Sequence, residues 1–98
     1  MSDIKDITWF KESIEPSLNE YKIEYKFFEE GDFGSLNQVE FNSNKKGGNI
    51  DFWELGWVGI FIWDYINEKE IMNILLKPEQ HKEIEVSLKK LQKLLTQQ

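Results

Sequence analysis

The stretch Trp-Glu-Leu-Gly-Trp-Val-Gly-Ile-Phe-Ile-Trp-Asp-Tyr-Ile, residues 53–66, holds three of the four tryptophans of the chain. Between residues 57 and 63 both alternating sets of side chains are apolar. A strand of this kind is typical of the middle of a sheet, covered on both faces. A chain of 98 residues can rarely cover both faces of a sheet by itself. We therefore expect either a second small core or an aromatic face left for a partner. One set is Trp57, Gly59, Phe61 and Trp63, and the other is Val58, Ile60 and Ile62.

Four further strands are predicted around this one. Alternation from residue 21 to 28 indicates a half-buried strand with Tyr21, Ile23, Tyr25 and Phe27 facing inward. Residues 29–35, with two glycines, predict a loop, and residues 36–43 predict a second strand with Val39 and Phe41 inward. Residues 44–49 predict a hairpin loop in which Gly47 and Gly48 supply positive φ. The third strand is predicted from residue 50 to 53 or 55, and Gly56 marks a turn or bulge after it. The fourth strand spans residues 57–66. A turn at residues 67–69 then leads to the fifth strand at residues 70–76.

Two amphipathic helices flank the strands. The first is predicted over residues 3–15, capped by Asp3 or Asp6 and ended by Pro16. Its buried stripe is Ile7, Phe10 and Ile14, and Trp9 lies off this stripe or at its edge. The second opens at residues 77–80 and runs to about Leu95, with a continuous stripe of Ile84, Leu88, Leu91 and Leu95.

The order α-β-β-β-β-β-α with short loops predicts an antiparallel meander. One sheet face can serve both helices, so the predicted fold is an α+β two-layer sandwich, a five-stranded antiparallel sheet with the N- and C-terminal helices on one face. Residues 1–98 form a single domain.

Composition excludes several function classes. The chain has no cysteine, which excludes disulfides and thiol chemistry, and no arginine, which disfavours direct nucleic-acid binding. His81 is the only histidine, and neither it nor any serine lies in a catalytic pattern, so we expect no enzyme activity and no metal or cofactor. The N-terminus is not a signal peptide and no segment is long enough to span a bilayer, so a cytoplasmic location is expected.

The net charge of −6 is uneven, because residues 1–64 hold 13 acids and 6 lysines whereas residues 65–98 hold 5 acids and 6 lysines. This acidity either keeps a small protein in solution or suits a basic protein partner. Glu29, Glu30 and Asp32 gather in one loop, which is either a solvated acidic loop or a contact for such a partner.

The aromatic face is the second candidate surface. If Val58, Ile60 and Ile62 face the helices, then Trp57, Phe61, Trp63 and Tyr65 share the opposite face, and Trp53 joins them in one of two registers of the third strand. Loops and strand curvature either cover these rings or leave an aromatic patch with an acidic rim of Asp51, Glu54 and Asp64. An exposed patch of that composition is typical of a protein-binding hot spot.

Three segments, Gly-Gly-Asn-Ile-Asp-Phe-Trp (47–53), Gly-Trp-Val-Gly-Ile (56–60) and Asn-Ile-Leu-Leu-Lys-Pro-Glu (73–79), together with the size and acidity of the chain, resemble small acidic bacterial immunity proteins of contact-dependent growth-inhibition systems. The resemblance covers about half the chain. It implies an immunity-like domain in the cytoplasm that binds one cognate toxin domain, often a nuclease, and blocks its active site or substrate surface. It assigns no residue a role.

The leading hypothesis is therefore a non-enzymatic protein that neutralises a basic toxin, with carboxylates that mimic substrate phosphates and aromatic anchors that supply buried area. The protein would be a monomer in the toxin complex and would bind neither nucleic acid nor membrane. The alternative is a homo-oligomeric structural or adaptor domain that associates through the aromatic sheet face. The candidate partner-binding residues are Glu29, Glu30, Asp32, Asp51, Trp53 and Glu54.

Overall fold

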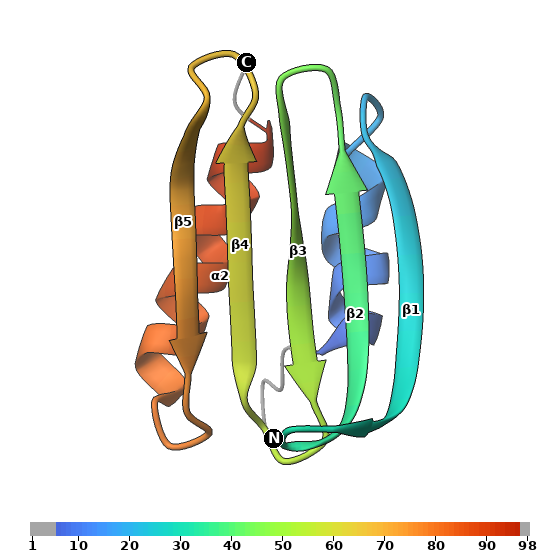
Figure 1. Cartoon of the computed structure of the whole chain (residues 1–98), viewed down its shortest axis with the longest axis vertical. Helices are drawn as coiled ribbons and strands as arrows, with labels where there is room; N and C mark the ends of the chain where they lie inside the picture. Colours follow the sequence, from blue (N-terminus) through green and yellow to red (C-terminus); the bar gives the residue numbers. More distant parts are fainter. Residues whose placement is uncertain (1–5, 97–98) are drawn as a thin grey trace.

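The computed structural model describes residues 6–96 and shows one antiparallel sheet with every described helix on the same face (Figure 1). The strand order is β1-β2-β3-β4-β5, so each strand pairs with its neighbours in sequence. The predicted α+β two-layer meander is confirmed. In chain order the elements are α1 (Ile7–Trp9), η1 (Phe10–Ile14), η2 (Glu15–Ser17), β1 (Lys22–Gly31), β2 (Gly34–Asn42), β3 (Lys46–Trp53), β4 (Val58–Asp64), β5 (Lys69–Leu76) and α2 (His81–Thr96).

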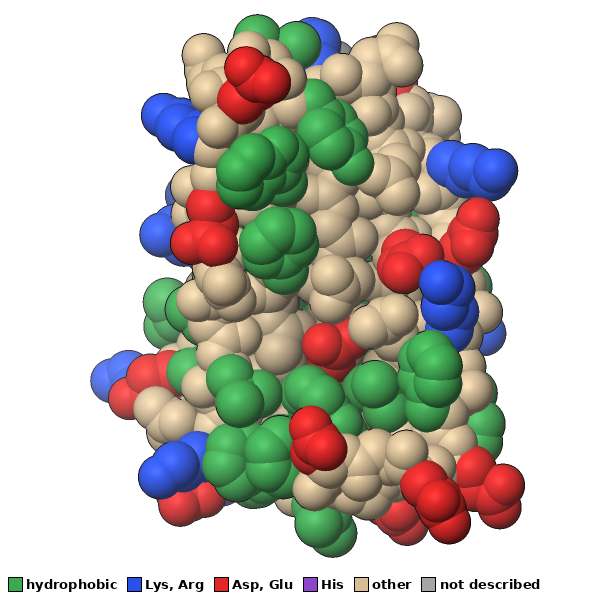
Figure 2. All heavy atoms as spheres, viewed as in Figure 1, with side chains coloured by type: hydrophobic (Ala, Val, Ile, Leu, Met, Phe, Trp, Pro, Cys, Tyr) green, Lys and Arg blue, Asp and Glu red, His purple; other side chains and the backbone are tan. Residues whose placement is uncertain are grey.

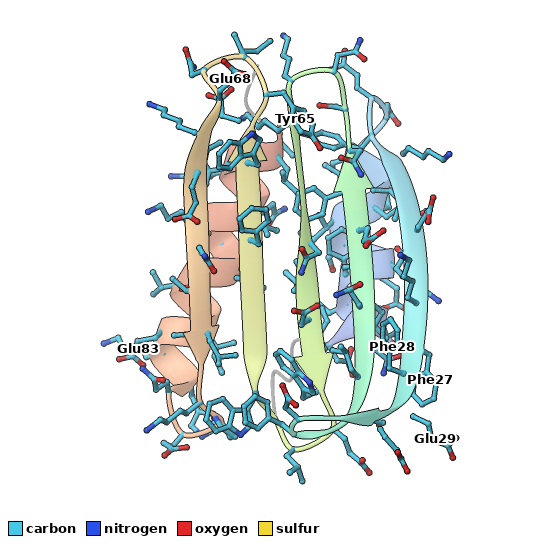
Figure 3. All side chains as sticks on the ribbon, viewed as in Figure 1. Phe27, Phe28, Glu29, Tyr65, Glu68 and Glu83 are labelled. Atoms are coloured by element: carbon cyan, nitrogen blue, oxygen red, sulfur yellow. The ribbon has the colours of Figure 1, made fainter. Side chains whose placement is uncertain are left out.

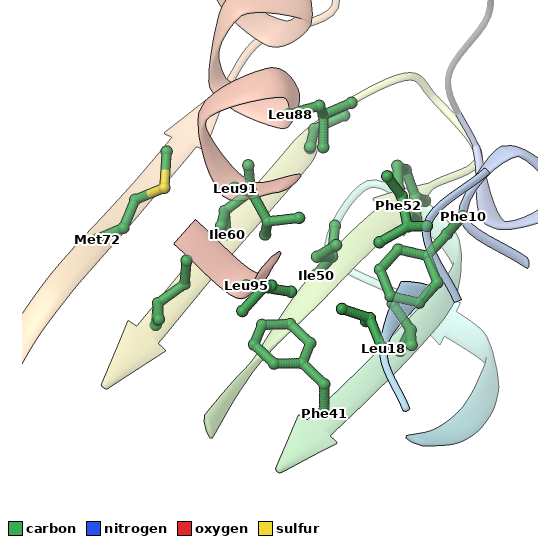
Figure 4. Packing of buried hydrophobic residues seen from close by; sticks show 14 residues of the cluster. Phe10, Leu18, Phe41, Ile50, Phe52, Ile60, Met72, Leu88, Leu91 and Leu95 are labelled. Carbon is green, nitrogen blue, oxygen red and sulfur yellow. The ribbon is translucent and has the colours of Figure 1, made fainter. Parts of the chain in front are cut away.

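The core lies between the sheet and the helices. Strand registers align one inward row across four strands, with Val39 paired to Ile50, Ile50 to Ile60 and Ile60 to Ile74. α2 lies behind β4 and β5, and the N-terminal helical segment lies behind β2 and its neighbours (Figure 1). Figure 4 shows the helix side chains entering between the inward rows. The buried cluster consists of Phe10, Ile14, Leu18, Val39, Phe41, Ile50, Phe52, Val58, Ile60, Ile62, Met72, Leu88, Leu91 and Leu95.

The N-terminal segment changes helix type twice. Asp6 is the cap, since its Oδ1 accepts a hydrogen bond of 3.1 Å from the backbone N–H of Trp9. The Glu15 N–H then donates to the Phe10 carbonyl, which defines a π-helical turn, and a 3₁₀ turn follows. The prediction that Pro16 ends the helix is wrong, because Pro16 lies in the first turn of η2, where a missing N–H costs nothing. The predicted start at residue 3, and Asp3 as a cap, lie outside the described residues.

The β1–β2 hairpin is longer than predicted. Glu29 and Glu30, expected in a loop, belong to β1, and the ladder reaches Gly31 opposite Gly34 after a register shift at Phe28. Phe27 was expected on the buried side of this strand, but 62% of its surface is exposed. This end of the hairpin reaches past the helix layer, and Phe27, Phe28 and Glu29 stand at its rim (Figure 3).

The predicted role of Gly47 and Gly48 is also wrong. Both lie inside β3, where Gly47 pairs with Asn42 and Trp63, and neither has positive φ. The turn comes earlier, at residues 43–46, and the Ser43 hydroxyl accepts from the N–H groups of Lys45 and Lys46. Gly47 is required by the side chains above it rather than by a turn, because an added Cβ would collide with the Tyr65 hydroxyl.

The remaining strand boundaries differ from prediction by one or two residues, whereas the last helix, predicted to open at residues 77–80, begins only at His81, so Pro78 precedes it. Gly56 does form the predicted turn, with φ of +96°. The turn between β4 and β5 spans residues 65–68, and Glu68 takes positive φ there. α2 begins at His81 and buries Leu88, Leu91 and Leu95, while Ile84 is half-buried. Among residues 6–96, no helix combines the length and the apolar character needed to cross a membrane.

Candidate functional site

The sheet face away from the helices divides into a polar region and an aromatic region. β1 and β2 present Lys26, Glu40 and Gln38 on this face, and Lys26 pairs with Glu40 at 3.1 Å. β4 presents Phe61 and Trp63, whose ring centroids lie 6.5 Å apart. In Figure 2 the apolar side chains form one group above the middle of this face and a band across its lower end. The aromatic face is therefore open, but it is not one continuous patch.

The lower band forms around the tip of the β1–β2 hairpin. Gly34 has φ of +87°, which turns the chain so that Phe33 folds back onto β3 and β4. The Phe33 ring stacks on Trp57, with centroids 3.9 Å apart and planes 5° from parallel, and meets Trp53 edge-on at 5.2 Å. Phe33 thus covers part of these rings, which is one of the two arrangements that the sequence left open. We call Phe33, Trp53 and Trp57 the hairpin aromatic cluster.

Trp53 is held between two glycines. A Cβ added at Gly59 would lie 3.3 Å from its ring, and one added at Gly31 would lie 3.1 Å from Nε1. The indole Nε1 is buried, and among the described residues no acceptor binds it. Trp53 belongs to the aromatic face, which settles the register that the sequence left open.

The structure brings the six predicted partner-binding residues to the same end of the sheet. Glu29, Glu30 and Asp32 are exposed at the hairpin tip, and none of the salt bridges between described residues involves them. Glu54 is exposed on the adjacent β3–β4 turn, and its Oε1 accepts from the Ser35 N–H at 3.1 Å. This bond ties the β3–β4 turn to the start of β2.

Asp51 lies beside Trp53 and is more enclosed than the other acids. Its Oδ1 accepts from Gln38 Nε2 at 2.7 Å and from Asn49 Nδ2 at 3.2 Å. These bonds fix the carboxylate within the polar part of the face. Asp51 and Glu54 lie within two residues of Trp53 and Asp32 precedes Phe33, whereas Glu29 and Glu30 lie farther along the hairpin. Four of these five acids face solvent.

The second aromatic group is Phe61, Trp63 and Tyr65 at the opposite end of the face. Tyr65 reaches across β3 to the end of β2, where its hydroxyl donates to the Asn42 side-chain oxygen (Figure 3). Asp64, predicted as part of the acidic rim, turns into the β4–β5 turn instead. Its hydrogen bonds from the Asn67 side chain and backbone hold the pKa of Asp64 below its usual range.

Sequence reasoning missed a groove at the same end of the molecule as the hairpin aromatic cluster. Its volume is about 820 Å³, and it lies between the start of α1, the β3–β4 turn and the start of α2. Trp53, Glu54 and Trp57 line it and also belong to the surface just described. No sequence period signals this groove, because it depends on how far the two helical segments lie apart over the sheet.

The described residues include no group of three or more potential metal ligands. His81 is exposed at the start of α2. Tyr25 has the most strongly shifted pKa among the described residues. Burial of the phenol and, next, its hydrogen bond to Glu15 raise this pKa. That pair joins β1 to η2 and is structural. The arrangement as a whole suits binding through carboxylates and rings.

Comparison of the chain with protein-family models, with curated proteins and with solved structures gave no match in any of the three.

Proposed function

We propose that this chain is a non-enzymatic bacterial immunity protein, which binds a cognate toxin domain in the cytoplasm and covers its basic active-site or substrate surface. The proposed toxin is a nuclease. The observation that supports the proposal most is that Glu29, Glu30, Asp32, Asp51 and Glu54 lie at the end of the sheet that carries the hairpin aromatic cluster. The likeness of three sequence segments to such immunity proteins supports it independently.

Each part of this surface has a separate role in the proposal. The exposed carboxylates steer a basic partner and pair with its lysines and arginines, as the phosphates of a nucleic acid would. The half-buried rings supply apolar area that dehydrates on contact, which slows dissociation. A rigid sheet end presents both, and its hairpin tip is fixed by the Phe33–Trp57 stack. Binding therefore needs little ordering of the protein.

The test begins with capture of the partner on the tagged protein at low salt, followed by an assay of the captured protein on DNA and RNA. We expect one basic protein in near one-to-one amount, whose nuclease activity is lost when the chain is added back. The triple variant Glu29→Lys, Glu30→Lys, Asp32→Lys should slow association by about tenfold or more at low salt, and the difference should shrink as salt is raised.

The matched control reverses three exposed acids away from this surface, Glu12, Glu20 and Glu68, and changes the net charge by the same amount. Equal association rates for the two triple variants would show that only net charge matters and would contradict the proposed surface.

The alternative is a homo-oligomeric structural or adaptor domain that uses the same face. Phe61, Trp63 and the 51%-exposed Leu75 remain open on β4 and β5, and a second copy could cover them by a two-fold axis. This alternative predicts a stable dimer without any other protein.

A further inference from the structure

The groove beneath the β3–β4 turn combines an apolar floor with acidic walls. Phe52 and Val58 are buried at its floor, and Ile7 and Ile84 line its sides as half-buried residues. Trp57 and Pro78 also line it. A volume of about 820 Å³ is enough for one long side chain together with the neighbouring backbone of a bound segment.

The charged groups that line the groove are three carboxylates and one imidazole. They are Asp6, Glu54, Glu85 and His81, and no lysine occurs among the described lining residues. Asp6 Oδ1 accepts from Trp9 N–H and Glu54 Oε1 accepts from Ser35 N–H, and for each the other carboxylate oxygen has no hydrogen bond to a described residue. Glu85 has only an exposed pair with Lys89 at 3.4 Å. The walls therefore retain acceptor capacity for a cation.

We propose that this groove binds an arginine side chain of a polypeptide partner. The proposal rests on the proposed function and names the chemistry of one contact in it. An arginine has an apolar stem that suits Phe52, Val58 and Ile84, and a planar head that can bind a carboxylate through two hydrogen bonds. The groove is also continuous with the proposed toxin surface through Trp53, Glu54 and Trp57, so one basic segment can reach both.

The direct test is an NMR titration with the peptide acetyl-Gly-Arg-Gly-amide. Its control is the same peptide with citrulline, which keeps the shape of arginine and removes its charge. We expect shifts at the Trp57 indole N–H, the Ile84 methyl groups and the Glu54 amide. The citrulline peptide should bind at least about fivefold more weakly, because its neutral head cannot form an ion pair with the carboxylates. Equal binding of the two peptides, or shifts confined to residues 29–32, would overturn the inference.

Matched variants locate the cation. Glu54→Gln and Glu85→Gln should each lower the affinity for the arginine peptide by a few-fold, whereas Glu83→Gln should leave this affinity unchanged. Glu83 lies in the first turn of α2, two residues before Glu85, but does not line the groove. If all three variants behave alike, the groove is not the site. If the peptide binds only after residues 1–5 are deleted, the chain's own segment occupies the groove and the inference is wrong.

The same variants separate this inference from the proposed function when the captured toxin replaces the peptide. Loss of toxin binding on hairpin charge reversal, with normal binding by the Glu54→Gln, Glu85→Gln double variant, would overturn the groove inference and leave the proposed function standing. Toxin binding that survives both sets of changes would remove the proposed surface as well.

Discussion

Gly47 shows how a single residue shapes the open face. Its Cα lies beneath the Tyr65 side chain, whose hydroxyl donates to Asn42, so any side chain at residue 47 would collide with both polar groups. Gly47→Ala should displace Tyr65, break this hydrogen bond and lower the free energy of unfolding by about 1–2 kcal/mol. Urea unfolding of Gly47→Ala, Tyr65→Ala and the double variant measures the coupling. We expect the double variant to lose less than the sum of the two single losses, and simple additivity would contradict the proposed collision.

Tyr25 provides a prediction of pH dependence at the same scale. Burial, the hydrogen bond to Glu15 and the charge of Glu15 raise the pKa of Tyr25 above its ordinary value of 10.0. The folded state therefore holds the phenol proton more tightly than the unfolded state. The corresponding stability is fully present below about pH 10 and is lost as pH rises toward the folded pKa. Tyr25→Phe should flatten the fall of unfolding free energy between pH 9 and 11, with Glu15→Gln intermediate because burial remains.

An unchanged pH slope in both variants would show that Tyr25 does not contribute to alkaline unfolding. The burial of Tyr21 also raises its pKa, so some alkaline loss should remain in Tyr25→Phe.

At the scale of elements, the N-terminal helical segment depends on Phe10. The segment has only one α-helical turn, then a π turn and a 3₁₀ turn, so it gains little from regular helix hydrogen bonding alone. Phe10 is fully buried and meets Tyr25 edge-on at 6.4 Å. Phe10→Ala should therefore cost about 3–5 kcal/mol of unfolding free energy. The exposed neighbour Ser13→Ala is the control, and urea unfolding measures both. A loss below about 1 kcal/mol for Phe10→Ala would show that the sheet is stable without this cover.

The sequence predicts elements well wherever side-chain periodicity follows burial. The inward rows of β2 and β4 and the stripe of α2 are as predicted, because one face of each is buried. It fails where the chain leaves the core. Glu29 and Glu30 belong to β1 although both are exposed. Gly47 and Gly48 are strand residues in crowded places, because a Cβ at Gly47 would meet the Tyr65 hydroxyl and a Cβ at Gly48 would meet the Phe61 backbone carbonyl. Pro16 does not end the helical segment, because it lies in the first turn of the 3₁₀ helix that begins at Glu15.

The candidate site could be predicted from the sequence only in part. The acids and Trp53 could be chosen from composition and alternation, and the fold then places them at one end of the sheet. The fold-back of Phe33 could not be predicted, since it depends on the positive φ of Gly34 and on contacts between residues distant in sequence. The groove likewise arises only from tertiary packing of three segments.

At the scale of the whole molecule, the charge and the division of the open face both oppose self-association. Phe33 covers part of the lower rings, and the polar Gln38–Asp51 pair lies on the same face. Two copies placed face to face would also each bring a net charge of −6. We therefore expect a monomer of 11.7 kDa by size exclusion with light scattering at micromolar concentration and low salt. A dimer of twice that mass would instead support the homo-oligomeric alternative if Trp63→Ser abolished it and hairpin charge reversal did not. Trp63 is the informative residue because it lies in the aromatic group that a second copy would cover.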